Sequence, residues 1–114
     1  MNDCLFCKII RGDIPSAKVY EDDLVYAFRD INPQAPTHVL VIPKQHISSV
    51  AAIDEASDEV IAACLRACRK VAELEGVTES GFRVVSNCGD DACQSVHHLH
   101  FHVLAGRKMT DTMA

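Results

Sequence analysis

The sequence predicts an α+β fold in which an antiparallel sheet buries one of its faces under a long helix. Three observations lead to this prediction: a long amphipathic stretch in the middle of the chain, short runs typical of strands on both sides of it, and histidines that alternate with apolar residues near the end. The 114 residues suit one domain covering positions 1–114, and with 48% hydrophobic residues they can form a real core.

The amino-terminal third is expected to form a short helix, a hairpin and a buried strand. Residues 4–11 are mostly apolar and stop at Gly12, which is typical of a helix that ends at a glycine. Lys18–Glu21 and Leu24–Arg29 flank two aspartates, a pattern that indicates a β-hairpin. The run His38–Ile42 lies between two prolines and is short and rich in β-branched residues, so it is expected to be a buried strand.

The second half of the chain is expected to supply one long helix and two more strands. Ser57 can cap a helix over Asp58–Glu75, and Gly76 follows where the helix would end. Phe82–Asn87 and His98–Leu104 are the remaining strands, joined by a loop. The apolar stripe expected to face the sheet consists of Ile61, Cys64, Leu65, Cys68 and Ala72.

Histidines alternate with apolar residues along the last of these strands. Side chains of a strand point alternately to its two faces, so three imidazoles share one face at a spacing of roughly 6.5 Å, while three apolar groups share the other. Such a row suits contact with a small anion, a catalytic zinc ion, or a purely structural role in which every ring has a hydrogen-bond partner. The residues in question are His98, His100 and His102, alternating with Leu99, Phe101 and Val103.

Charge and composition restrict the partners. A formal charge of −5 argues against a nucleic-acid polymer, although a single nucleotide remains compatible. No run approaches the roughly 18 apolar residues of a membrane span, and the start of the chain does not resemble a secretory signal. We therefore expect no membrane partner, a cytoplasmic protein, and six cysteines that remain reduced.

Several motifs in the same order resemble the histidine triad (HIT) family, in particular its histidine triad nucleotide-binding branch. The resemblance covers about residues 4–108 and implies a HIT-like fold with a five-stranded antiparallel sheet, one long and one short helix, and a symmetric homodimer. The motifs that carry it are Gln-Ser-Val-His-His-Leu-His-Phe-His-Val-Leu at 94–104, Asp-Ile-Asn-Pro-Gln-Ala-Pro-Thr-His at 30–38, the following Val-Leu-Val-Ile-Pro-Lys, Phe-Cys-Lys-Ile-Ile at 6–10, and Ile14-Pro15.

The resemblance implies hydrolysis of a phosphoramidate or acyl-phosphate bond at the phosphorus of a purine nucleoside monophosphate. By position, His100 matches the nucleophile that forms a nucleotidyl-histidine, and His102 and His38 match hydrogen-bond donors around the phosphoryl group. Ser95 matches a serine that contacts phosphate and helps protonate the leaving group. This chemistry needs no cofactor for catalysis.

The resemblance also implies a nucleoside pocket. Asp30 matches a carboxylate that accepts hydrogen bonds from the ribose hydroxyls, and Asn87 matches a polar residue at the ribose and phosphate. Taken alone, the apolar positions would be read as ordinary core, and only the resemblance assigns them to the base. They are Phe6, Ile9, Ile14, Phe28 and Ile31.

The Cys4-x-x-Cys7 pair allows three interpretations from the residues alone: a redox pair, half of a zinc site, or two separate thiols. The resemblance implies a structural zinc held by Cys4, Cys7, His46 and His98, because two thiolates and two imidazoles complete a closed tetrahedral set. Under this assignment His98 belongs to the metal, and His100 remains able to react.

Two points remain open in the sequence. Cys93 stands where a glycine is common in the family, so either the loop is rearranged or the cysteine adopts the same backbone conformation. The alternatives to a phosphoramidate hydrolase are a nucleotide-binding regulatory or interaction module with weak catalysis, and a dinucleoside polyphosphate hydrolase.

Overall fold

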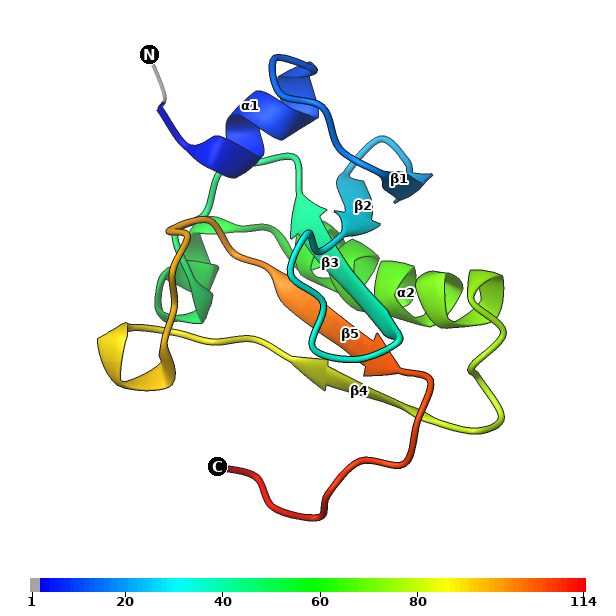
Figure 1. The fold of residues 1–114 in the computed structure, drawn as a ribbon. Helices are drawn as coiled ribbons and strands as arrows, with labels where there is room; N and C mark the ends of the chain where they lie inside the picture. The colour runs from blue at the N-terminus through cyan, green and yellow to red at the C-terminus, as the bar shows by residue number, and fades with distance from the viewer. Residues whose placement is uncertain (1–2) are drawn as a thin grey trace.

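The computed structural model describes residues 3–114, and in this range the chain folds into one five-stranded antiparallel sheet with two α-helices and two short 3-10 helices (Figure 1). The strands lie in the order β1-β2-β3-β5-β4, so the last strand of the chain lies inside the sheet and β4 forms an edge. The α+β prediction, with one long and one short helix, is confirmed. In chain order the elements are α1 Leu5–Arg11, β1 Lys18–Glu21, β2 Val25–Arg29, β3 Thr37–Pro43, η1 Val50–Glu55, α2 Asp58–Leu74, β4 Phe82–Val85, η2 Asp90–Ala92 and β5 Phe101–Ala105.

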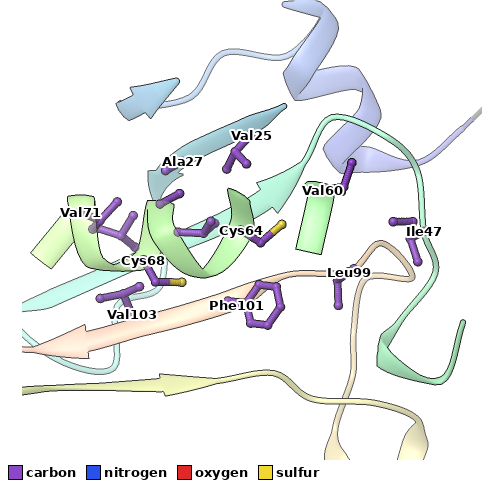
Figure 2. Packing of buried hydrophobic residues seen from close by; sticks show 13 residues of the cluster. Val25, Ala27, Ile47, Val60, Cys64, Cys68, Val71, Leu99, Phe101 and Val103 are labelled. Atoms are coloured by element: carbon purple, nitrogen blue, oxygen red, sulfur yellow. The ribbon is translucent and has the colours of Figure 1, made fainter. Parts of the chain in front are cut away.

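Helix α2 covers one face of the sheet and forms the larger core with it (Figure 2). The Ser57 hydroxyl caps its first turn by accepting from the Val60 N–H at 3.2 Å. Cys64 and Cys68 lie in this core, and burial raises the pKa of each thiol to about 12, so both behave as small core residues. The other core members that α2 contributes are Val60, Ala67 and Val71.

The apolar stripe expected on α2 is partly wrong, because Leu65 is 52% exposed and Ile61 is only half-buried. The helix faces the sheet with positions 60, 64, 67 and 71, so the true buried stripe is rotated away from Leu65. Leu65 fits the periodic pattern because it is three residues from Cys68 and next to Cys64. The sequence pattern cannot fix this rotation, which depends on how the helix sits on the sheet.

Helix α1 covers part of the opposite face, where it closes a second, smaller core. Phe6 meets Phe28 of β2 edge-on, with ring centroids 5.5 Å apart, and Ile9 belongs to the same cluster. Leu40 and Ile42 of β3 complete the cluster's contacts, which explains why every residue of β3 is buried. The strand expected at His38–Ile42 is thus confirmed, and it extends by one residue at each end.

The last two strands are shorter than expected at the ends nearest the histidine row. Strand β5 begins at Phe101, so His98–His100 precede it, because the Leu99 N–H donates at 2.6 Å to the Ile47 carbonyl, which lies outside the sheet. Strand β4 ends at Val85 rather than Asn87. The alternation nevertheless persists beyond the ladder, since Leu99 belongs with Phe101 and Val103 to the core beneath α2.

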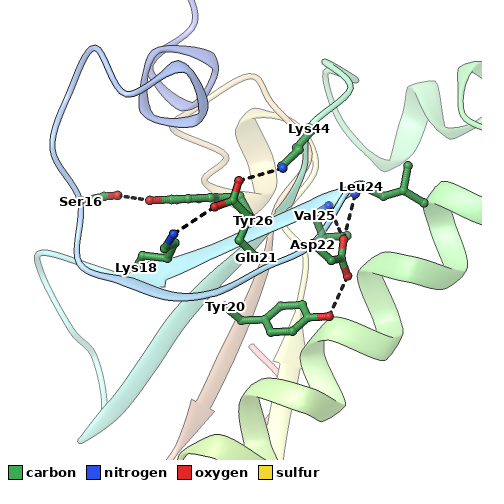
Figure 3. Close-up of polar contacts among 9 residues, drawn as sticks. All are labelled: Ser16, Lys18, Tyr20, Glu21, Asp22, Leu24, Val25, Tyr26 and Lys44. Carbon is green, nitrogen blue, oxygen red and sulfur yellow. Dashed lines mark hydrogen bonds and ion pairs between the residues drawn. The ribbon is translucent and has the colours of Figure 1, made fainter.

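The β1–β2 hairpin is closed by one aspartate (Figure 3). Asp22 accepts from the backbone N–H groups of Leu24 and Val25, both at 2.9 Å, and from the Tyr20 hydroxyl at 2.8 Å. Partial burial opposes ionisation of Asp22, but these three donors together hold the pKa of its carboxyl below the ordinary value. The hairpin predicted from the aspartate-flanked pattern is therefore an Asx-type turn.

No helix within residues 3–114 is both long enough and apolar enough to cross a membrane.

Cys93 adopts the left-handed conformation, with φ 62°, and no other non-glycine residue described here has a positive φ. The backbone therefore has the form that a glycine would favour, which resolves the question left open by the sequence.

We expect Cys93→Gly to raise the free energy of unfolding by about 0.5–1 kcal/mol. Relief of the left-handed strain outweighs the added freedom of the unfolded chain. Chemical denaturation measures the change. Ala92→Gly is the control, because Ala92 lies in η2 without a positive φ, and it should lower stability. A stability that is unchanged or lower in Cys93→Gly would contradict the prediction.

Candidate active site and metal centre

Strands β3 and β5, together with the segment just before β5, bring four histidines to the face of the sheet that carries α1. His102 pairs in register with Leu40, and His38 pairs with Leu104, so His38 and His102 lie diagonally opposite each other. The ring centroids of His38 and His102 are 5.1 Å apart, as are those of His100 and His102. His98 is fully buried, and His38 and His100 are each 5% exposed.

The backbone fixes the orientation of the His100 ring. Its Nδ1 lies 2.7 Å from the carbonyl oxygen of His98, which can only accept a hydrogen bond. Nδ1 therefore carries a proton, and in the neutral ring the lone pair is on Nε2. Phe6 of α1 packs edge-on against the same ring at 5.1 Å between centroids, so both polar and apolar contacts hold it. A neutral imidazole with a free Nε2 is a competent nucleophile.

A hydrogen-bonded chain joins His38 to His102. The Gln34 N–H donates to Nδ1 of His38 at 3.0 Å, and Nε2 of His38 lies 2.8 Å from Nδ1 of His102. An oxygen of Asp30 lies 3.4 Å from the same Nε2. Burial lowers the pKa of His38, against the attraction of Asp30. Burial, with smaller contributions from His100 and His38, lowers the pKa of His102 to about 4, so both rings are neutral at pH 7.

A cavity of about 320 Å³ opens between α1, the end of β2 and the histidine row. Nine of the residues predicted for the site line it, and Val96, Leu5 and Leu40 extend its wall beyond the prediction. Ile31 is 92% exposed, so it stands at the rim instead of in the wall. The nine are Phe6, Ile9, Ile14, Phe28, Asp30, Ile31, Ser95, His100 and His102.

Two predicted site residues do not line this cavity. His38 lies behind His102 and acts on it through the hydrogen-bonded chain described above. Asn87 is half-buried and follows the end of β4, and the structure does not bring it to the cavity. Its neighbour Ser86 is the closer link, because its hydroxyl donates to the His100 carbonyl at 2.8 Å.

Gln94 braces the loop that carries Ser95, and sequence reasoning assigned it no role. It is 8% exposed, its Oε1 accepts from the Gly89 N–H at 2.9 Å, and its Nε2 donates to the Ser48 carbonyl at 2.8 Å. A buried amide with both ends satisfied fixes the path of the loop. The available signal was the glutamine of the 94–104 motif, since neither periodicity nor charge marks this position.

Cys4, Cys7, His46 and His98 converge at the start of α1, as the family resemblance implies. Their ligand atoms all lie within 4.8 Å of one another. From Nδ1 of His98 the distances are 3.3 Å to Sγ of Cys4, 3.6 Å to Sγ of Cys7 and 3.2 Å to Nδ1 of His46. Tetrahedral zinc bonds of 2.0–2.3 Å imply ligand separations of about 3.3–3.8 Å, so the donor set fits such an ion.

The tautomer of His98 also fits a metal ligand. Its Nε2 lies 2.9 Å from the Pro43 carbonyl, which can only accept, so Nε2 carries the proton and Nδ1 offers its lone pair to the cluster. The same residue thus presents its side chain to the cluster and its carbonyl to His100.

An ion pair joins the end of β2 to the end of α2. Arg29, at the end of β2, makes two parallel hydrogen bonds of 2.8 Å to the carboxylate of Glu75, next to the end of α2. The Arg29 guanidinium holds the pKa of Glu75 below its ordinary value, against partial burial. This ion pair ties the end of β2, from which Asp30 follows, to the long helix.

The comparisons with known proteins agree with this geometry. The HIT domain family matches residues 11–109. A 14 kDa zinc-binding protein of Zea mays is 50% identical over 107 residues, which cover 92% of this chain and 83% of that protein. The purine nucleoside phosphoramidase of Escherichia coli K12 is 43% identical over 112 residues, covering 98% of this chain and 94% of that protein.

Solved structures give the same result. A HIT family hydrolase from Clostridium thermocellum superposes with a TM-score of 0.95 at 46% identity, covering 100% of this chain and 99% of that one. A histidine triad nucleotide-binding protein from Candida albicans gives a TM-score of 0.82 at 32% identity, covering 98% of this chain and 87% of that one. Sequence motifs, sheet order and histidine geometry therefore agree, and this chain belongs to the HIT domain family.

Proposed function

We propose that this protein hydrolyses phosphoramidate or acyl-phosphate bonds of purine nucleoside monophosphates through a nucleotidyl intermediate on His100. The observation that carries the proposal is the His100 ring, whose Nδ1–H is held by the His98 carbonyl at 2.7 Å while its Nε2 lone pair is left for the cavity it lines. The name of the Escherichia coli relative, purine nucleoside phosphoramidase, supports the reaction class.

In the first step, Nε2 of His100 forms a bond to the α-phosphorus as the bond from phosphorus to the leaving group breaks. The departing nitrogen or oxygen takes a proton from solvent, which the Ser95 hydroxyl at the cavity wall can relay. Negative charge spreads over the phosphoryl oxygens, and a hydrogen-bond donor from His102 stabilises it. In the second step, water attacks the phosphorus and gives a proton to solvent as the bond from phosphorus to Nε2 breaks, which releases neutral His100 and the nucleoside monophosphate.

The cavity's lining suits a nucleoside. Apolar side chains from α1 and β2, among them Ile9 and Phe28, offer packing for a purine, and the Asp30 carboxylate in the same lining can accept from two ribose hydroxyls. About 320 Å³ is small for a ligand site, which favours a mononucleotide derivative over a dinucleoside polyphosphate. The contact of Asn87 with ribose and phosphate remains a prediction.

We also propose that Cys4, Cys7, His46 and His98 hold a structural zinc ion. The separations between ligand atoms and the tautomer of His98 support this, as does the name of the zinc-binding Zea mays relative. The bound ion would fasten the start of α1 to His98, which precedes β5. Catalysis needs no further cofactor in this proposal.

The edge of the sheet at β4 supports a homodimer. Val84 pairs with the core residue Val103, so it points to the α2 side of the sheet, yet it remains 38% exposed. One flank of α2 carries Arg66 and Lys70 and lies along β1. The opposite flank of α2, which carries Leu65, therefore lies on the β4 side of the sheet. Exposed apolar side chains beside a free strand edge suit self-pairing of two chains.

We further propose a cytoplasmic location for the protein. Cys64, Cys68, Cys88 and Cys93 are free thiols, and reduced thiols are typical of that compartment.

We expect His100→Ala to abolish turnover of adenosine phosphoramidate while binding of adenosine monophosphate stays measurable, because the cavity keeps its apolar wall and Asp30. Single-turnover kinetics and calorimetry measure the two effects. His97→Ala is the matched control, since His97 is exposed and does not line the cavity. Near-normal hydrolysis by His100→Ala, together with no trapped nucleotidyl-enzyme in the parent, would rule out the mechanism.

Protein prepared without chelator should contain close to one equivalent of zinc, and Cys4→Ser should lose most of it, because one of four ligands is missing. Metal analysis by mass spectrometry measures the content, and thermal unfolding should shift downward on chelation. Cys88→Ser is the control, because Cys88 is exposed and contacts Ser49 instead of the cluster. Less than about a tenth of an equivalent in the parent would contradict the zinc assignment.

Sedimentation at micromolar concentration should show a dimer, and Leu65→Glu should shift it to monomer by placing a charge in the proposed interface. Leu74→Glu is the control, because Leu74 is equally exposed at 53% and lies half a turn away around α2. A parent that sediments only as monomer, or a Leu74→Glu variant that dissociates as readily as Leu65→Glu, would contradict this interface.

A further inference from the structure

One backbone N–H determines which nitrogen of His38 carries the proton. The Gln34 N–H is a donor only, and it points at Nδ1 of His38 from 3.0 Å, so Nδ1 must supply a lone pair. The carboxylate of Asp30, 3.4 Å from Nε2, can only accept and favours a proton on that nitrogen. Two neighbours of opposite character therefore select the same tautomer, with the proton on Nε2.

The tautomer of His38 determines the tautomer of His102. The proton on Nε2 of His38 is shared with Nδ1 of His102 at 2.8 Å, so Nδ1 of His102 is the acceptor. A neutral imidazole that accepts at Nδ1 must carry its own proton on Nε2. Because His102 lines the cavity, that second nitrogen is the one left for a ligand.

We propose that Gln34 is a positioning residue whose backbone N–H sets the tautomers of His38 and His102, so that His102 presents a neutral Nε2–H donor to the phosphoryl group. The tautomer chain stands on the contacts alone, and only its use at a phosphoryl group rests on the proposed function. A neutral donor is held in place before the substrate arrives, so no proton has to be acquired during the reaction.

The loop that carries Gln34 is braced on both sides. The Asp30 N–H donates to the His38 carbonyl at 3.0 Å, and the Asp30 carboxylate accepts from the Asn32 N–H at 2.8 Å. On the far side, Arg107 donates to the Gln34 carbonyl at 3.3 Å. The peptide groups around Gln34 are therefore held from both directions, as a fixed donor requires.

The same N–H argues against a metal ion at the second cluster of potential ligands, which consists of Asp30, His38 and His102. A metal bound at Nε2 of His38 would need the proton on Nδ1, where it would face the N–H of Gln34 donor to donor. His98 shows the opposite arrangement, because a carbonyl oxygen takes its Nε2–H and leaves Nδ1 for a metal. A backbone N–H thus faces the ring of His38 in the proposed catalytic site, whereas a backbone carbonyl faces the ring of His98 in the proposed metal site.

The test measures the tautomers directly. In protein labelled with ¹⁵N at the histidine rings, long-range ¹H–¹⁵N spectra at pH 7 should show the proton on Nε2 of His38 and of His102, and on Nδ1 of His100. Gln34→Pro removes the N–H and should give mixed tautomers at His38 and His102, with kcat for adenosine phosphoramidate reduced about tenfold and a smaller change in affinity for adenosine monophosphate.

Two further versions of the protein separate the effect of the N–H from the effects of the side chain and of the proline ring. Gln34→Ala loses the side chain but retains the N–H, so it should keep the parent's tautomers. Replacing the Pro33–Gln34 amide by an ester through semisynthesis removes the N–H with little change in shape, and it should reproduce the effect of Gln34→Pro even if the proline variant folds poorly.

A parent with the proton of His102 on Nδ1, or an ester protein with the parent's tautomers, would overturn the proposal. Altered tautomers with unchanged kcat would overturn its catalytic part. If the parent shows the expected tautomers but does not hydrolyse adenosine phosphoramidate, the proposed function fails and the tautomer assignment is still supported.

Discussion

The alternation of residues 99–103 is the constraint on which the rest of the structure depends. Leu99, Phe101 and Val103 are drawn into the core under α2, and this burial forces the intervening histidines to the other face. A shift of one residue in the pairing of β5 with β3 would exchange the two sets and place imidazoles in the core. The apolar side chains thus fix the register of the site, although none of these three touches the ligand cavity.

Helix α1 shows how the two sites are built from a single short element. Phe6 packs against both His98 and His100, with ring centroids 5.9 Å and 5.1 Å away. In the sequence it lies between Cys4 and Cys7, the two cysteines of the Cys/His cluster. Since the carbonyl of His98 also orients His100, the Cys/His cluster and the proposed nucleophile share one residue and one packing partner. The docking of seven helical residues therefore affects both sites together.

Much of this arrangement could be predicted from the sequence, because strong local patterns survive folding. The histidine alternation and the Ser57 cap were found at the expected positions, and the four predicted metal ligands lie together. The rotation of α2, which left Leu65 exposed, could not be predicted, since it depends on the helix meeting a particular sheet surface. The proposed role of Gln34 could not be predicted either, because every residue type except proline carries a backbone N–H. The direction of that N–H depends on the path of the loop.

The order of the strands has a consequence for the way the chain folds. The hairpins of β1, β2 and β3 join neighbouring segments, whereas His38 and His102 are 64 residues apart in sequence and meet only when β5 enters between β3 and β4. Closing so long a loop is slow compared with forming a hairpin, so the central strand is expected to arrive late. Because His98, His100 and His102 all come with this segment, a partly folded chain holds an unpaired β3 edge and has no assembled histidine row. The histidine row is then assembled in one step, as the last strand inserts.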